Sequence, residues 1–164
     1  MLHPILKHQL TKDVKLLHKV ALVVGDQVLI LKRSPTASSR PEKWDLPGGN
    51  SEWPINQQVV QKDLHQQDLV REVQEETGIA LETKNFTTKN LTYFTTYFEP
   101  DKQLYSINCG WVVKLNSASV NDLTILLSSE HTEYAWIDLS KLDYYNFGGS
   151  ERDYETAIIR QALA

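Results

Sequence analysis

Apolar residues first form a continuous run at residues 20–24, and a second run at residues 28–31 follows the turn Gly25-Asp26-Gln27. Two short apolar runs joined by a glycine-containing turn are typical of paired antiparallel strands. The first run contains no polar position, which predicts a strand covered on both faces of its sheet. Later apolar and alternating segments predict further strands at residues 91–98, 105–115 and 134–137.

Two segments carry the spacing of helices. Residues 63–77 predict a helix that stops at Gly78, a residue suited to a left-handed C-terminal cap. A second helix is expected near the end of the chain, where Tyr154, Ile158 and Ala162 recur at helical spacing. Early strands, a helix midway and a helix at the end predict an α/β fold with a mixed β-sheet between helices on both faces.

The segment before the first helix is rich in turn-forming residues. Residues 34–41 contain serine, threonine and two prolines, and Trp44-Asp45-Leu46-Pro47-Gly48-Gly49 follows shortly after. Proline and paired glycines favour a turn over regular structure. We therefore expect a loop here that leads towards the first helix.

Carboxylates dominate one side of that helix. At about 100° per residue, Glu72, Glu75 and Glu76 fall within one arc, beside an apolar arc that contains Leu69 and Val73. Crowded carboxylates repel one another, and the dipole near a helix C-terminus also disfavours negative charge. A hard divalent cation would reverse that cost, since Mg²⁺ prefers oxygen ligands. A solvated acidic helix face is the alternative for these three residues alone.

Composition narrows the class of protein. The chain has 164 residues, 41% hydrophobic and 23% charged, which is typical of a soluble globular protein, and residues 1–164 are expected to form one domain. Cys109 is the single cysteine, and we find no apolar run near the roughly 20 residues of a membrane span and no secretory signal, so the cytoplasm is expected. The net charge of −4 argues against nucleic acid as a partner, and no membrane partner is expected; either the ligands are not anions, or a bound cation recruits them.

Together these residues resemble a known family. The segment Arg71-Glu72-Val73-Gln74-Glu75-Glu76-Thr77-Gly78-Ile79 is similar to the second half of the Nudix box, G-x5-E-x7-R-E-U-x-E-E-x-G-U with U aliphatic, at every specified position. Leu46-Pro47-Gly48-Gly49 resembles the usual lead-in, with Gly49 as the first glycine of the box. Lys32-Arg33 and the segment 130–136 also look typical of the family, so the resemblance spans about residues 19–142.

The first half of the box departs from the pattern. Thirteen residues separate Gly49 from Asp63, where the family has five before its glutamate, so about eight residues are inserted near residues 53–61. Either Asp63 replaces the first glutamate of the box or Glu52 supplies it from the loop.

The resemblance implies a Nudix-like α/β/α sandwich and a hydrolase that uses Mg²⁺, or alternatively Mn²⁺, to cleave a diphosphate bond with a metal-activated water. It assigns metal ligation to Glu72 and Glu76, with Glu75 as third ligand or partner of a ligand, and to the backbone carbonyl of Gly48. Arg71 would orient a carboxylate of the box. Glu130 is either an additional ligand or base, or a surface acid. The substrate contacts implied are Arg33, Gly48 and Gly49.

The expected partner is a small nucleotide-type diphosphate; oxidised nucleoside triphosphates, nucleotide sugars and dinucleotides all fit the resemblance. Small members of the family are often dimers, which makes a homodimer an open alternative. The competing interpretation is a Nudix-like module that binds or senses a nucleotide without turnover. The complete second half of the box favours the enzyme, because degenerate modules usually lose its glutamates.

Overall fold

The computed structural model describes residues 13–52, 64–149 and 153–164. Across these ranges the strands are β1 (Asp13–Val24), β2 (Gln27–Arg33), β3 (Trp44–Asp45), β4 (Leu91–Glu99), β5 (Leu104–Lys114) and β6 (His131–Ile137). The α-helices are α1 (Gln66–Thr77) and α2 (Asp153–Ala162), and short 3-10 helices include η2 (Thr83–Asn85) and η5 (Leu139–Tyr144). Each strand predicted from the apolar runs is present.

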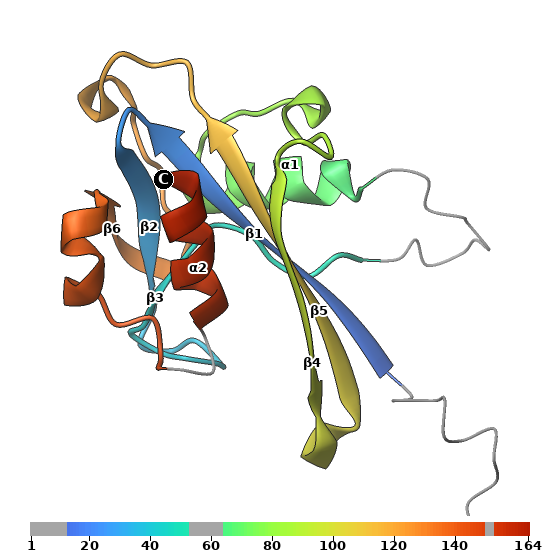
Figure 1. Cartoon of the computed structure of the whole chain (residues 1–164). Coiled ribbons are helices and arrows are strands. Elements are labelled where there is room, and N and C mark those ends of the chain that lie inside the picture. Colours follow the sequence, from blue (N-terminus) through green and yellow to red (C-terminus); the bar gives the residue numbers. More distant parts are fainter. Residues whose placement is uncertain (1–12, 53–63, 150–152) are drawn as a thin grey trace, which may run out of the picture.

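The strands form one mixed sheet in the order β3-β2-β1-β5-β4, and β6 pairs with the free side of β2 (Figure 1). The long strands β1 and β5 run parallel, whereas the other pairs are antiparallel. Residues 20–24 of β1 are buried, which confirms a strand covered on both faces.

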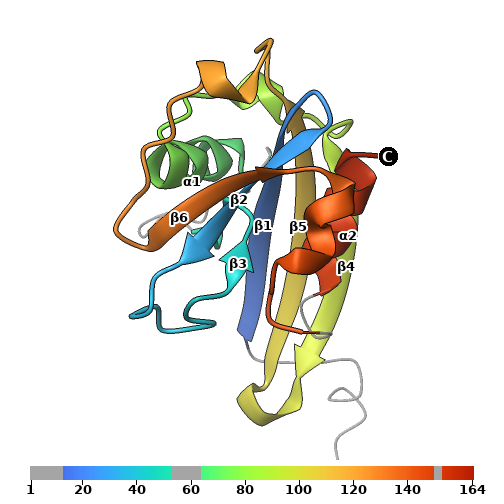
Figure 2. The same ribbon diagram turned by 90° about the vertical axis from the view of Figure 1, so that its left-hand side faces the viewer.

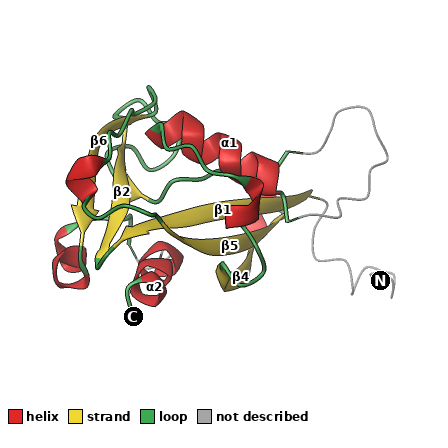
Figure 3. Ribbon diagram, turned by 90° about the horizontal axis from the view of Figure 1, so that it is seen from above, coloured by secondary structure: helices red, strands yellow, loops and turns green. Residues whose placement is uncertain are grey.

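One helix covers each face of the sheet, α1 on one side and α2 on the other (Figure 3). On α1, Leu69 and Val73 pack with Val20 and Leu22 of β1. On the opposite face, α2 buries Ile158 and Ile159 against a second cluster that includes Ala21. The predicted α/β fold, a mixed sheet between helices, is therefore confirmed.

The hairpin formed by β1 and β2 opens beyond its turn. The two strands pair only at Val23↔Val28 and Val24↔Gln27, after which β2 diverges from β1 and pairs on that side with β3, while β6 pairs along its other edge (Figure 2). The space that β2 leaves beside β1 is occupied by the segment of residues 46–51, which we call the glycine loop. A bridge between Leu17 and Asn50 marks this approach.

The first helix begins later than the sequence predicts. His65 has the left-handed backbone angles φ 56° and ψ 36°, which are incompatible with a right-handed helix, so α1 begins at Gln66. Its C-terminus is as predicted: Gly78 has φ 74°, and its N–H donates to the carbonyl of Gln74. The last helix is also confirmed, with Tyr154, Ile158 and Ala162 all buried.

Some predictions fall on residues outside the described ranges. Asp63 and the inserted segment at residues 53–61 are among them, so their proposed roles stay predictions. No helix within the described ranges is long and apolar enough to cross a membrane.

Candidate functional site

The glycine loop lies directly against β1. His18 N–H donates to the Gly49 carbonyl at 2.9 Å, and Val20 N–H donates to the Pro47 carbonyl at 2.8 Å. Gly48 has φ +128°, and a Cβ added there would stand 2.3 Å from the His18 carbonyl oxygen. Such an approach is open only to glycine. The loop backbone is therefore held in one place beside the strand.

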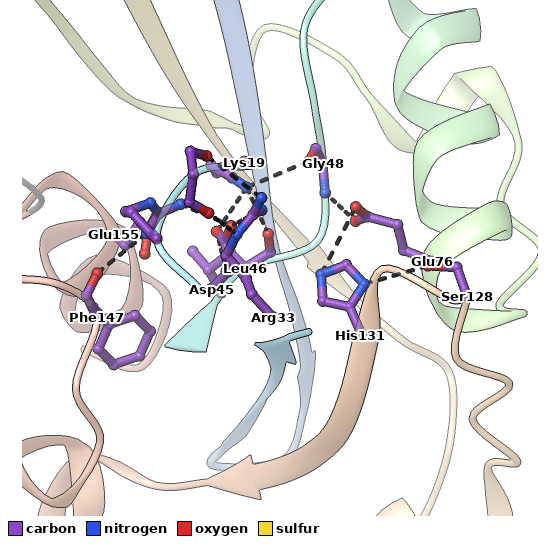
Figure 4. Close-up of polar contacts among 12 residues, drawn as sticks. Lys19, Arg33, Asp45, Leu46, Gly48, Glu76, Ser128, His131, Phe147 and Glu155 are labelled. Carbon is purple, nitrogen blue, oxygen red and sulfur yellow. Dashed lines mark hydrogen bonds and ion pairs between the residues drawn. The ribbon is translucent and has the colours of Figure 1, made fainter. Parts of the chain in front are cut away.

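Two of the predicted glutamates contact this loop from α1. The Gly48 N–H donates to Oε2 of Glu76 at 2.7 Å (Figure 4). A Cβ added at Gly49 would lie 2.7 Å from Oε2 of Glu72, so the missing side chain makes room for that carboxylate. The structure thus brings together Gly48, Gly49, Glu72 and Glu76.

Burial changes the protonation of both carboxyl groups. It raises the pKa of Glu76 to about 8, against the lowering influence of Lys19 and of the Gly48 N–H. Burial also raises the pKa of Glu72, with the Arg71 guanidinium opposing it. The His131 ring lies 4.0 Å from Glu76, and burial lowers its pKa, so it offers little positive charge. Among the described residues, Arg71 opposes the rise in the pKa of Glu72 and Lys19 that of Glu76, but neither outweighs burial.

Arg71 lies on the solvent side of this pair. Its Nη1 is 2.8 Å from Oε1 of Glu72 and 3.2 Å from Oε2 of Glu75, and its Nη2 is 3.7 Å from Oδ1 of Asp68. Glu75 is 58% exposed at its side chain and is directed to Arg71. This geometry suits the orienting role predicted for Arg71.

The glutamates do not form a closed ligand cage. Within the described ranges, no three His, Cys, Asp or Glu side chains stand close enough together to hold a metal ion by themselves. Glu72 and Glu76 are separated by the contacts just described, and the Gly48 carbonyl lies 3.4 Å from the Lys19 ammonium. A cation at this place would have to use loop backbone, water or substrate oxygens as well, which is the usual habit of Mg²⁺.

Glu130 and Arg33 lie at a polar pocket on the far side of the loop after β2. The pocket measures about 380 Å³, and we call it the hydroxyl pocket because its lining is Arg33, Ser34, Thr36, Ala37, Ser38, Ser129 and Glu130. The charge of Glu130 reaches Glu72, whose pKa it helps to raise. The predicted carboxylate at 130 is therefore within electrostatic reach of the α1 glutamates.

A buried group of charges, absent from our sequence predictions, lies behind the glycine loop. Asp45 is 1% exposed and pairs with Lys19 at 2.6 Å and Arg33 at 3.2 Å (Figure 4). It also pairs with Arg40 at 2.8 Å. Arg40 also lies 3.0 Å from Glu155 of α2, which is fully buried. These five residues are called the ion cluster below.

The ion cluster fastens the loops that border the site. The Lys19 ammonium donates to the carbonyls of Leu46 and Gly48 in the glycine loop. Arg33 donates to the Ser39 carbonyl within the loop that lines the hydroxyl pocket. The predicted substrate-binding Arg33 thus also has a structural role, and both loops are anchored on Asp45.

The two carboxyl groups of the cluster differ in charge. Burial acts to raise the pKa of Asp45, but Lys19 and Arg40 outweigh it and hold that pKa well below its usual range. Burial and the Asp45 carboxylate raise the pKa of Glu155 well above its usual range, against Lys19 and Arg40. Asp45 is therefore the anion to which the cations are matched.

His18 is fixed by two further hydrogen bonds. Trp111 Nε1–H donates to Nδ1 of His18 at 2.9 Å, so the ring carries its proton on Nε2 and donates it to the Ser51 hydroxyl at 2.7 Å. Burial lowers the pKa of His18 to about 4. A histidine that donates to serine cannot also take its proton, so His18 positions the glycine loop rather than activating Ser51 as a nucleophile.

The fold is of the α/β class, with a mixed sheet that holds a glycine loop against a helix of carboxylates. The NUDIX domain family model matches residues 18–158, and the chain therefore belongs to the Nudix family. Its activity class is that of a Nudix-type pyrophosphohydrolase. Comparison with curated proteins gives no match.

Solved structures show the same fold. The MutT protein from Methanosarcina mazei Go1 is 23% identical with a TM-score of 0.62, covering 93% of this chain and 98% of that one. The MutT NUDIX hydrolase from Burkholderia pseudomallei is 18% identical with a TM-score of 0.62, covering 92% and 98%. A bifunctional NMN adenylyltransferase/ADP ribose pyrophosphatase from Francisella tularensis, complexed with AMP and a Mn ion, is 18% identical with a TM-score of 0.59, and 97% of this chain matches 44% of it.

Proposed function

We propose that this chain hydrolyses a diphosphate bond in a small nucleotide-type substrate, in a reaction that depends on Mg²⁺ or Mn²⁺. One observation carries the proposal: Glu76, 8% exposed, is held against the Gly48 N–H with its pKa raised to about 8. Natural proteins bury a carboxyl group in this way at a cost, and perturbed carboxyl groups cluster at functional sites. A divalent cation bound beside the carboxylate would offset the free-energy cost of burying it.

The residues present fit such a cation. Glu72 and Glu76 adjoin the glycine loop, and the Gly48 carbonyl retains a lone pair beside its contact with Lys19, so these three groups would hold the ion. We assign Glu75 as a partner rather than a direct ligand, because its carboxylate is exposed and directed to Arg71. When bound, the cation supplies a water of lowered pKa and neutralises charge on the diphosphate.

Other side chains orient these groups and move protons. Nη1 of Arg71 lies within ion-pair distance of both the Glu72 and the Glu75 carboxylate and would orient them. We assign Glu130 as the base, since it combines exposure to solvent with electrostatic reach to Glu72. A carboxylate in that position can take a proton from an attacking water.

The hydroxyl pocket would receive the part of the substrate beyond the diphosphate. Its lining offers serine and threonine hydroxyls and the Arg33 side chain, which suit ribose hydroxyls or phosphate oxygens. The Francisella tularensis relative, whose structure contains AMP and a Mn ion, supports a nucleotide-type substrate and Mn²⁺ as a second usable metal. A homodimer, a cytoplasmic location and a single domain over residues 1–164 stay predictions.

The test is a phosphate-release screen over nucleoside triphosphates, ADP-ribose, nucleotide sugars and dinucleoside polyphosphates. Each substrate is assayed with Mg²⁺, with Mn²⁺ and with EDTA, using wild type, Glu76→Gln and the control Glu133→Gln. Glu133 makes only an exposed ion pair with Lys32, so its variant should keep wild-type turnover. We expect one substrate class to be turned over, with loss in EDTA and a fall of several orders of magnitude in Glu76→Gln. Nucleotide binding with no turnover of any substrate would instead favour a binding module.

A further inference from the structure

We propose that the chain carries a second anion-binding site, separate from the carboxylates of α1, which takes a small polyphosphate without a metal ion. The site is a hollow of about 410 Å³. It is lined by residues from the end of β5 and the beginning of β4, which lie side by side at one end of the sheet (Figure 1). We call it the lysine hollow; its lining is Lys84, Asn85, Lys89, Asn90, Thr92, Val112, Val113 and Lys114. This inference does not depend on the proposed hydrolysis.

The lining of the lysine hollow is positively charged, whereas the protein as a whole is negatively charged. The whole chain has a net charge of −4, yet three lysines and no acidic residue are found among the described residues that line the hollow. Lys84 makes an exposed ion pair with Glu82 at 2.9 Å. Lys89 and Lys114 make no ion pair within the described part of the chain, whereas most other described cations have a carboxylate partner. Two ammonium groups are thus available for an added anion.

The frame that presents these lysines is rigid. Asn90 accepts hydrogen bonds from the backbone N–H of Thr87 at 3.0 Å and from its hydroxyl at 2.7 Å, which closes the turn containing Lys89. The Asn90 amide then donates to the Val112 carbonyl, tying the turn to β5. On the other side, η2 is closed by a reciprocal pair of bonds between Glu82 and Asn85. A preorganised frame reduces the entropy lost on binding.

The chemistry of the lining selects the ligand. Lysine ammonium groups act as point charges and are established phosphate binders, and several around one hollow favour an anion with several charges. Thr92 also lines the hollow, and its hydroxyl is a further hydrogen-bond donor. A volume of about 410 Å³ lies in the range of small-molecule sites, roughly 300–1,000 Å³. A di- or triphosphate group, free or attached to a nucleoside, meets these requirements.

The hollow is distinct from the Nudix site. In the register of the parallel strands, Lys114 lies opposite Val23, whereas Gly110 lies opposite Lys19 at the glycine loop. Four residues of strand separate the two positions, a distance of about 13 Å along the sheet. The α1 carboxylates require a cation before they can hold phosphate, but the lysine hollow does not. Removing divalent cations with EDTA should therefore abolish phosphate binding at the Nudix site and leave binding in the lysine hollow unchanged.

The experiment is a calorimetric titration of the full chain with sodium tripolyphosphate, ATP and citrate, at low salt and in EDTA. The variant is Lys89→Glu/Lys114→Glu, and the control is Lys102→Glu/Lys141→Glu, which changes the net charge equally at exposed lysines elsewhere. For each of tripolyphosphate and ATP, we expect the control to bind with the same affinity as wild type. The Lys89→Glu/Lys114→Glu variant should bind each ligand at least tenfold more weakly. Amide NMR shifts of Lys89 and Asn90 on titration would place the ligand independently.

Four outcomes would overturn the proposal. Equal weakening in both double variants would show a response to overall charge alone. Citrate binding as tightly as tripolyphosphate would remove the preference for phosphate, and ATP binding without tripolyphosphate would show that the nucleoside is what is recognised. Loss of binding in Glu76→Gln, but not in the hollow variant, would assign the anion to the Nudix site. Circular dichroism of both double variants establishes that each is folded.

Discussion

The α1 carboxylates and the ion cluster lie on either side of the glycine loop and treat charge in opposite ways. On α1, Glu72 is half-buried and Glu76 is largely buried, and both have raised pKa values although Arg71 opposes the rise at Glu72 and Lys19 opposes it at Glu76. In the ion cluster, Asp45 is more deeply buried, yet Lys19 and Arg40 hold its pKa well below its usual range, and Arg33 lies 3.2 Å away. In the first region, burial outweighs the nearby cations, whereas in the second the cations outweigh burial.

This difference in charge pairing indicates a structural role for the ion cluster and a binding role for the α1 carboxylates. A buried ion pair seldom adds much net stability, but it fixes geometry, and removing one partner leaves a costly isolated charge. Lys19 and Arg33 connect Asp45 to the two loops that border the site. The ion cluster is therefore expected to hold the loops in place. The α1 carboxylates are instead proposed to bind a cation from solution.

The largest expected effect comes from removing the anion of the ion cluster. Asp45→Asn would leave Lys19, Arg33 and Arg40 buried or half-buried without their shared partner. We expect the free energy of unfolding to fall by about 3–5 kcal/mol. Urea denaturation followed by circular dichroism measures it. A loss below about 1 kcal/mol would mean that the cluster does not support the scaffold.

The next effect concerns the pH dependence of the loop anchor. The folded-state pKa of His18, about 4, lies below the unfolded value of 6.5, so the unfolded state binds more protons between these values. Its contribution to stability is present above pH 6.5 and is lost as the pH falls towards 4, by on the order of 3 kcal/mol. Unfolding measured across this range in wild type and His18→Gln isolates it. Identical slopes in the two proteins would contradict the burial of a neutral ring.

A smaller effect is expected where the loop meets the α1 carboxylates. In Gly49→Ala the new Cβ would displace the Glu72 carboxylate, which is the flexible end of a side chain. We expect kcat/KM with Mg²⁺ to fall about tenfold, equivalent to about 1.4 kcal/mol, with stability nearly unchanged. Gly48→Ala is the harsher companion, because its Cβ meets the His18 backbone at a positive φ, and it should lose stability too. Full activity in Gly49→Ala would argue against Glu72 as a ligand.

The smallest effects should come from carboxyl groups whose charge is not required. Burial and Asp45 raise the pKa of Glu155 well above its usual range, which favours the neutral carboxyl group that Glu155→Gln imitates. Glu75 is exposed and makes a surface ion pair with Arg71. We expect Glu155→Gln and Glu75→Gln each to change the free energy of unfolding by less than about 1 kcal/mol. A loss in Glu155→Gln as large as that in Asp45→Asn would show that both carboxyl groups are ionised.

The sequence predicted the elements well because their signals are local. Apolar runs located the strands, and Gly78 marked the end of α1. The start of α1 was predicted too early, since the spacing of residues 63–77 carries no sign that His65 is left-handed. A backbone angle of this kind depends on tertiary surroundings and not on the helical pattern.

The site residues also differ in whether a local sequence signal identifies them. The motif brought Glu72, Glu76, Gly48 and Gly49 to attention, because they lie in two short, recognisable stretches. The ion cluster could not be assembled from the sequence, because its members are far apart in the chain. One signal was present: Lys19 is a charged residue directly before a continuous apolar run, and such a residue in a buried strand requires a partner.

The parallel pairing of β1 with β5 also governs how the protein is made. Residues 13–23 pair with residues 104–114, so the strand that carries Lys19 and anchors the glycine loop finds its neighbour about 90 residues later. Contacts of such long sequence separation close slowly, since the loop entropy is lost before the pairing compensates it. During synthesis, the segment that contains α1 emerges well before β5 does. The segment that carries Glu72 and Glu76 is thus synthesised early. It is expected to gain its folded surroundings only when most of the chain has left the ribosome.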